Sequence, residues 1–140
     1  MGQTEGGLDG NLSFGSTDAF VVKYDPNGNK LWTRQWGSPN RDVAQTVATN
    51  AAGAVYVAGQ SMGNPDGWVR AGSGDIFLLK YDANGVEQGS LLKGTSRNDE
   101  ATGMTIDRAG NIYVAGVTSG DLDGNPNPGG IDLFLCKLRQ

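Results

Sequence analysis

With 140 residues, the chain is long enough for one domain with a hydrophobic core, and its apolar runs are far shorter than the roughly 20 residues of a membrane-spanning helix. The net charge of -4 and the pI near 4.6 argue against binding to a nucleic-acid backbone, which requires clustered Lys and Arg. The 23 glycines have no Gly-X-Y period and therefore predict short strands joined by many tight turns.

A repeat of 57 residues runs through the whole sequence. Residues 3–59 align with residues 60–116 without a gap, and residues 117–140 begin the unit a third time. We therefore divide the single domain 1–140 into repeat units 3–59, 60–116 and the incomplete 117–140. The offset is clearest in an aspartate and a phenylalanine that recur in every unit: Asp18 and Phe20, Asp75 and Phe77, Asp132 and Phe134.

Each unit is predicted to hold four short β-strands. The first, DAFVVKYD, is apolar on both faces, so we expect it between two layers. An Asn-Gly pair, typical of tight hairpins, separates it from the second strand. The third strand is rich in Ala and Thr, and the fourth reads AVYVAG. No apolar stripe of 3.6-residue period supports the alternative, a repeated helix pair. The predicted strands are 18–25, 30–36, 42–50 and 54–59, then 75–82, 86–93, 99–107 and 111–116, and finally 132–139.

Three strings carry a family resemblance: NIYVAG, TSGDLDGNPNPGGIDLFLCK and DAFVVKYDPNGNKLWTRQWG. They resemble the bacterial β-propeller repeat family called SBBP and, more distantly, the NHL-type propellers, over essentially the whole chain. The resemblance implies an all-β propeller of four-stranded antiparallel blades, often in large secreted or surface-attached proteins, without a shared enzymatic activity. It also implies the order of strands in a blade, from 42–50 innermost through 54–59 and 75–82 to 86–93 outermost.

About two and a half repeats cannot close a propeller, which typically has four to eight blades. The chain then holds an outer half blade, one complete blade and a blade without its outermost strand. We expect apolar residues to be exposed at the ends of this stack, where they drive association: Val47, Val57, Phe77 and Met104. The resulting prediction is a homo-oligomer, a trimer or tetramer, whose C-terminal strands are completed by the N-terminal strands of the next copy. Strands 18–25 and 132–139 would compete for one position. The alternative is a fragment of a larger single-chain surface propeller.

No catalytic residues are predicted. The sequence has no histidine, which removes Ser-His and Cys-His pairs and imidazole metal sites. Its one cysteine, Cys136, follows an apolar run and is interpreted as a small buried residue. Recurring aspartates such as Asp18 and Asp42 could pair as in a glycosidase, but hydrogen bonding at turns and strand ends explains their recurrence better. We therefore expect no enzymatic activity and no cofactor, calcium aside.

A long connection joins the fourth strand of each unit to the next unit, and its third copy suggests a calcium site. There DLDGNPNPGGID places oxygen-bearing side chains at the ligand spacing of an EF-hand loop: Asp121, Asp123, Asn125, Asn127 and Asp132. The match departs from that motif because Pro126 stands where the loop needs glycine and because no flanking helices are predicted. The competing interpretation is Asp-Gly and Asn-Pro turn chemistry.

The long connections and the short ones at 37–41 and 94–98 alternate with the hairpin turns, so we expect all of them on one face. Binding residues are concentrated on such loops, and aromatic and arginine side chains are typical anchors. The candidates are Phe14, Arg41, Trp68, Arg70 and Arg97. Phe14 and Trp68 could instead cover the rim between blades. Trp32 and Trp36 have no counterpart in the second unit, so we assign them to outer-strand packing.

These observations predict a non-catalytic, self-assembling propeller that acts as a scaffold or binds protein or glycan. The alternative is a calcium-assisted adhesion or carbohydrate-binding unit. The family resemblance implies an extracellular or cell-surface location, although the residues after Met1 do not form a signal peptide. Neither a nucleic-acid partner nor a membrane span is expected.

Overall fold

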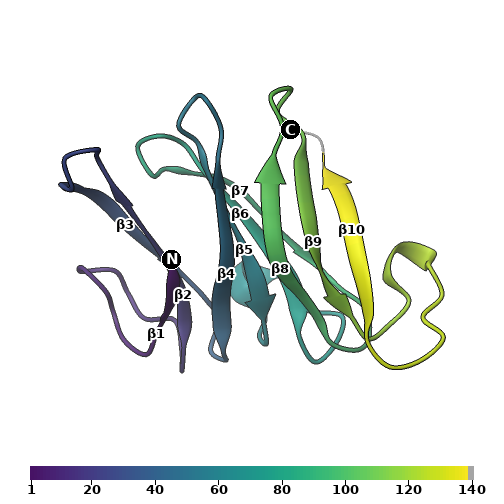
Figure 1. The fold of residues 1–140 in the computed structure, drawn as a ribbon. Coiled ribbons are helices and arrows are strands. Elements are labelled where there is room, and N and C mark those ends of the chain that lie inside the picture. Colours follow the sequence, from purple (N-terminus) through teal and green to yellow (C-terminus); the bar gives the residue numbers. More distant parts are fainter. Residues whose placement is uncertain (139–140) are drawn as a thin grey trace.

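The computed structural model describes residues 1–138, apart from the side chain of Asp66, and its strands form three antiparallel sheets (Figure 1). The central sheet has four strands in the order β4 (Asp42–Thr49), β5 (Val55–Ser61), β6 (Asp75–Tyr81) and β7 (Glu87–Lys93). This is the order that the sequence predicts for a complete blade, and the strand bounds lie within two residues of the predicted ones.

The first and last sheets have three strands each. The first has the order β1 (Gly2–Thr4), β2 (Asp18–Tyr24) and β3 (Lys30–Trp36), which are the repeat equivalents of β5, β6 and β7. The last has the order β10 (Asp132–Leu138), β9 (Ile112–Thr118) and β8 (Asp99–Ile106), which are the equivalents of β6, β5 and β4. Within the described residues these sheets match the predicted incomplete blades. Arg139, the predicted end of the last strand, lies outside the described residues.

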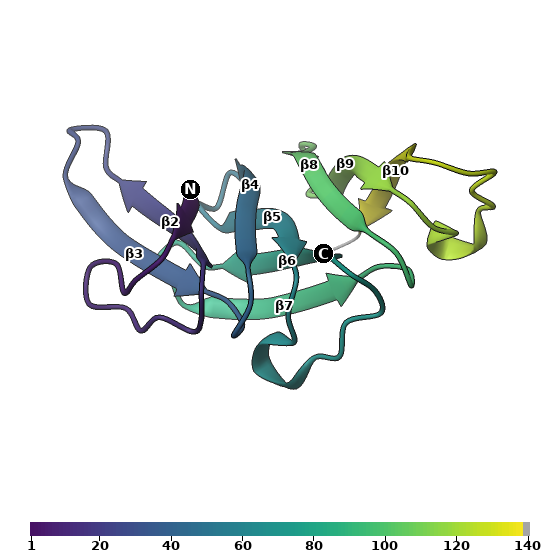
Figure 2. The same cartoon turned by 90° about the horizontal axis from the view of Figure 1, so that it is seen from below.

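The three sheets stand beside one another rather than forming one continuous sheet (Figures 1 and 2). The central and last sheets approach each other through their first strands, β4 and β8. The helical segments of the described chain are two 3-10 turns, η1 (Pro65–Gly67) and η2 (Leu122–Gly124), and none of its helices has the length or apolar character to cross a membrane. The described part of the chain is therefore all-β.

The hairpin turns at the upper edge in Figure 1 share one local structure. In each, an Asp or Asn Oδ1 accepts hydrogen bonds from the backbone N–H groups two and four residues later, as Asp25 does from Asn27 and Asn29 at 2.9 and 2.8 Å. The glycine three residues after the acceptor has a positive φ of 79° to 86°, which glycine adopts at little cost. The tight turns predicted from Asn-Gly are thus confirmed. The four acceptors are Asp25, Asn50, Asp82 and Asp107.

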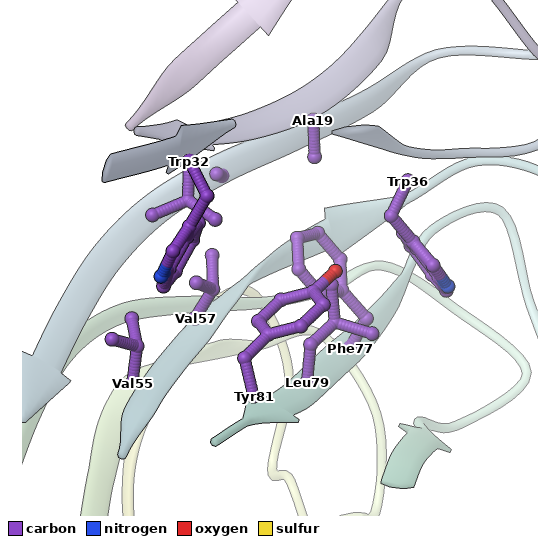
Figure 3. Packing of buried hydrophobic residues seen from close by; sticks show 10 residues of the cluster. Ala19, Trp32, Trp36, Val55, Val57, Phe77, Leu79 and Tyr81 are labelled. Atoms are coloured by element: carbon purple, nitrogen blue, oxygen red, sulfur yellow. The ribbon is translucent and has the colours of Figure 1, made fainter. Parts of the chain in front are cut away.

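The larger apolar core lies between the first and central sheets (Figure 3). The ring centroids of Trp36 and Phe77 are 4.7 Å apart, and those of Trp32 and Tyr81 are 6.0 Å apart. Both tryptophans are on the outermost strand, as expected, but they are buried between two sheets. The expectation that Val57 and Phe77 lie at an open end is wrong, because the first sheet covers both completely.

A second core joins the central sheet to the last one. Ile76 and Tyr56 of the central sheet are buried there together with Ile112 and Val114 of β9. Cys136 packs against this core, and its partial burial raises the pKa of the thiol above its ordinary value. A thiol with a raised pKa is a poor nucleophile, which agrees with the structural interpretation of this cysteine.

The exposed apolar surface at the ends of the stack differs from the predicted one. Of the four residues expected there, only Val47 is exposed, whereas Met104 is half-buried against the second core. On β10, Leu133 and Leu135 are 87% and 73% exposed and point to the same open face of the last sheet. The uncovered apolar surface is therefore this face of the last sheet, whereas Val57 and Phe77 are buried.

Candidate interaction surface

The long and short connections meet at one edge of the sheets, opposite the hairpin turns, as the alternation along the chain predicts (Figure 1). We call this the loop edge and define it as residues 5–17, 37–41, 62–74, 94–98 and 119–131. Neighbouring loops are joined by backbone hydrogen bonds at strand starts, from Asp42 N–H to the Thr17 carbonyl and from Asp99 N–H to the Gly74 carbonyl, both 2.8 Å. The loops therefore form one connected surface.

Buried aspartates at strand starts hold the short loops. Asp42 and Asp99 are both fully buried. Asp42 Oδ2 accepts hydrogen bonds from the backbone N–H and the hydroxyl of Ser38, at 2.6 and 2.7 Å. Asp99 Oδ2 accepts the equivalent bonds from Thr95, at 2.6 and 2.8 Å. Each short loop is thus tied to the first residue of the following strand.

Two further aspartates do the same for the long loops. Asp18 Oδ2 accepts hydrogen bonds from the Phe14 N–H at 2.8 Å and from Gln35 Nε2 at 2.7 Å. Asp75 Oδ2 accepts one from the Ala71 N–H at 2.6 Å. The recurrence of aspartate at these positions therefore has the structural cause that the sequence suggested, which is hydrogen bonding at turns and strand ends.

Burial sets the electrostatics of these aspartates. It raises the pKa of Asp42 above the ordinary value of 3.8, and the negative charge of the neighbouring Asp18 adds to the rise, against the lowering by hydrogen bonds from Ser38. Burial also raises the pKa of Asp75, where Asp99 is the neighbouring negative charge. Each of the first two long loops and the short loop beside it are thus held by two buried carboxyl groups, which repel each other when both are ionised.

Exposed apolar side chains gather on the long loops. Phe14 and Trp68, predicted as anchors, are 45% and 40% exposed. Leu12, Val69 and Ile131 are more exposed still, at 77%, 82% and 71%, and were not predicted. Their signal in the sequence is apolar residues inside glycine-rich connections. We call these five residues the apolar rim; every one of the three long loops contributes to it.

The three predicted arginines have different roles. Arg70 is only half-exposed, and its Nη1 donates hydrogen bonds to the carbonyls of Met62 and Ser73, at 2.8 and 3.1 Å, so it braces its own loop. Arg41 and Arg97 are exposed on the two short loops. Arg41 Nη2 donates a hydrogen bond to Gln3 Oε1 at 3.2 Å. Arg41 and Arg97 therefore present exposed positive charge on the short loops, whereas the Arg70 guanidinium is engaged in holding its own loop.

The five residues with EF-hand spacing are mostly engaged in local contacts. Asp121 Oδ1 accepts a hydrogen bond from the Asn127 N–H at 2.8 Å, and Asn125 Nδ2 donates one to the Leu122 carbonyl at 3.0 Å. Asp123 forms an ion pair with Lys93 at 2.5 Å. Among the described residues, no three His, Cys, Asp or Glu side chains gather as metal ligands would. Asp132, at the start of β10, lines one pocket together with Asp123, Asn125 and Asn127. Calcium binding here stays a prediction.

The same turn occurs in all three long loops, which supports the turn interpretation of these residues. The backbone N–H of Asn11, Trp68 and Asn125 each donates to the carbonyl three residues earlier, at 2.8 to 3.0 Å. Asp9 and Asp123, at the equivalent position, both have a positive φ, 53° and 55°. Asp9 pairs with Lys30 at 2.7 Å, and this contact holds the pKa of Asp9 below its ordinary value.

Comparison with known proteins points to one type of repeat. Residues 88–123, from β7 to η2, match the sequence model of the SBBP family, described as a beta-propeller repeat. The chain is 31% identical over 138 residues to the regulatory protein FlaEY of Caulobacter vibrioides, and 26% identical over 137 residues to the uncharacterized WD repeat-containing protein L264 of Acanthamoeba polyphaga mimivirus. These alignments cover 89% and 86% of this chain but only 14% and 10% of the relatives.

Proposed function

Residues 88–123 carry a beta-propeller repeat of the SBBP family, and from this premise we propose that the chain is a non-catalytic protein-interaction module that binds its partners at the loop edge. The observation that carries the proposal is the apolar rim: five exposed apolar side chains on three long loops, two of which are held in place by buried aspartates. Exposed apolar side chains that gather on one edge of a protein are typical of a binding site. The similarity to a protein named as regulatory supports the same role.

The bracing of the loops favours tight recognition. A loop that is ordered before binding loses less conformational entropy when a partner is bound. Asp18, Asp42, Asp75 and Asp99 are all buried and all hold loop backbone, so they are engaged in structure rather than presented to a substrate. This supports binding over catalysis as the role of the loop edge.

Peptide selection tests the proposal. Panning a random peptide library on the wild-type chain should yield binders. Trp68→Ala should weaken binding of the selected peptides by roughly tenfold or more, because truncating an aromatic hot-spot residue typically costs about 2 kcal/mol or more. Calorimetry on the purified chain measures the loss. Val69→Ser on the loop edge should also weaken binding, whereas Val86→Ser, an exposed valine on the hairpin edge, should not.

Two results would contradict the proposal. One is that Val69→Ser and Val86→Ser weaken the peptides equally, which would place binding elsewhere. The other is that no peptide is selected while a glycan array gives binding that depends on Trp68, which would favour the carbohydrate-binding alternative.

Self-assembly is a second candidate function, favoured by the open face of β10. One repeat earlier, Ile76 and Leu78 occupy the positions of Leu133 and Leu135 and are covered by the last sheet. A further blade of the same kind, from a second copy of the chain, would cover Leu133 and Leu135 in the same way. Such a contact would join copies of the chain into the trimeric or tetrameric ring that the repeat number predicts.

Light scattering at micromolar concentration tests this assembly. The wild-type chain, 14.6 kDa per copy, should have the mass of three or four copies, and Leu135→Asp should shift it to single copies because a charge cannot be buried without a partner. Leu12→Asp, at an equally exposed leucine on the loop edge, is the control and should leave the mass unchanged. A wild-type chain with the mass of one copy would end the ring proposal and favour a segment of a longer propeller.

A further inference from the structure

One part of the interface between the first and central sheets is filled by the indole ring of Trp32. Trp32 on β3 is 8% exposed, and its Nε1 donates a hydrogen bond to the Ala83 carbonyl at 3.1 Å. Its ring centroid lies 6.0 Å from that of Tyr81 (Figure 3). The Lys23 ammonium stands 5.7 Å from the centroid of the Trp32 ring. The two sheets thus hold a planar aromatic group between apolar walls and a cation.

The next interface lacks this group. Gly89 occupies the position of Trp32 one repeat later, and it pairs with Lys80 on β6 as Trp32 pairs with Lys23 on β2. A Cβ atom added to Gly89 would meet no other atom within 4 Å. The place of the missing side chain is therefore open.

A cavity occupies that place. It has a volume of about 300 Å³ and we call it the Gly89 pocket. Its lining combines residues of the central sheet with two from the last sheet: Tyr56, Leu78, Lys80, Gly89, Ser90 and Leu91, and Ile112 and Leu138. A volume of this size lies at the small end of ligand pockets, which suits one side chain rather than a large ligand.

The lining keeps the lysine of the filled interface and is otherwise more apolar. Lys80, the equivalent of Lys23, has its ammonium 5.6 Å from the ring centroid of Tyr56. Leu91 and Leu138 stand at the positions of Arg34 and Tyr81, so the walls are more apolar than in the first interface. Apolar walls with one cation at the rim favour a planar aromatic group over an aliphatic or anionic one.

We propose that the Gly89 pocket receives an aromatic side chain, tryptophan being the model, from an extended segment of a partner protein. The bound ring would take the place that Trp32 takes between the first two sheets. This site goes beyond the loop edge, because its lining comes from strand residues of two sheets and from none of the loop-edge residues.

Fluorine NMR of a labelled peptide tests the pocket without interference from the three tryptophans of the chain. The probe is acetyl-Gly-(5-fluoro-Trp)-Gly-amide, and its line should broaden with wild-type protein, with a dissociation constant on the order of 1 mM for a single side chain. Gly89→Trp places an indole in the pocket and should weaken binding at least about tenfold. Gly89→Ala adds only a Cβ and should bind as the wild type does.

The remaining variants separate the possible failures. Gly89→Leu, a smaller filler, should also prevent broadening and serves if Gly89→Trp does not fold, as judged by circular dichroism. Trp68→Ala should bind the probe normally, so a negative result here leaves the loop-edge proposal untouched. An unbroadened line with wild-type protein, equal broadening with Gly89→Trp, or uptake of free 5-fluoroindole but not of the peptide would each overturn the assignment.

Discussion

Replacing Phe77 with alanine should lower the free energy of unfolding by about 3–5 kcal/mol, the range for truncating a buried phenylalanine. Phe77 is fully buried, and its ring stacks at 4.7 Å on Trp36 across the interface between the first two sheets. The substitution removes this contact and leaves a cavity whose rigid walls come from two sheets and cannot collapse freely. Urea denaturation followed by tryptophan fluorescence measures the loss.

Phe134→Ala is the matched control, because it truncates the same position one repeat later. Phe134 is only half-buried at the edge of the second core, so its loss should be smaller, about half that of Phe77→Ala. Equal losses would contradict our view that the interface between the first and central sheets is the main stabilising core. A larger loss at Phe134 would contradict it more strongly.

The strands themselves could be predicted because each depends on local sequence. The short apolar runs in AVYVAG and DIFLLKYD, bounded by turn residues, predict strands, and the glycine of each hairpin turn is required by its positive φ. The order of strands within a blade is what the family resemblance implies, and the repeat extends that order to each unit. The packing between repeat units was predicted wrongly from the sequence. We expected Phe77 to be exposed, whereas the first sheet, with Trp36 among its residues, covers it.

The candidate site was less predictable than the strands, because its contacts depend on how separate segments of the chain pack together. Trp68 and Phe14 are aromatic residues in predicted loops, and both are exposed in the structure, as expected. The bracing role of Arg70 depends on where the carbonyls of Met62 and Ser73 lie, which no spacing in the sequence reveals. The spacing from Asp121 to Asp132 resembles that of an EF-hand loop, and calcium binding there stays a prediction, because spacing alone does not reveal whether the backbone curves around one point. In the structure, Asp121 Oδ1 accepts a hydrogen bond from the Asn127 N–H.

Asp42→Ala should be the second most destabilising of the changes considered, with a loss of roughly 3 kcal/mol. The substitution leaves the backbone N–H and the hydroxyl of Ser38 without the acceptor they share, and an unsatisfied buried donor costs about 1–3 kcal/mol. Asp42→Asn keeps an oxygen for these bonds and removes the charge, so it should lose much less. Urea denaturation at neutral pH distinguishes the two variants.

The pH dependence of the free energy of unfolding, compared between the wild type and Asp42→Asn, tests the effect of the buried Asp42 charge. Burial raises the pKa of Asp42 in the folded chain, so the folded state binds this proton more readily than the unfolded state. The stabilising contribution is therefore complete below the ordinary value of 3.8 and is lost as pH rises through the folded-state pKa. Asp42→Asn is neutral at every pH, and its free energy of unfolding should gain on that of the wild type as pH rises.

The other shifted aspartates do not obscure this comparison. Asp75 has a raised pKa as well, but it is present in both proteins and cancels in the difference. Asp9, Asp25 and Asp107 have lowered pKa values, so their contributions are present above 3.8 and are lost only as pH falls below it. A difference between wild type and Asp42→Asn that stayed constant from about pH 4 to about pH 7 would mean that Asp42 titrates alike in the folded and unfolded chains. The loop edge would then rest on hydrogen bonds alone, without the electrostatic cost that burial implies.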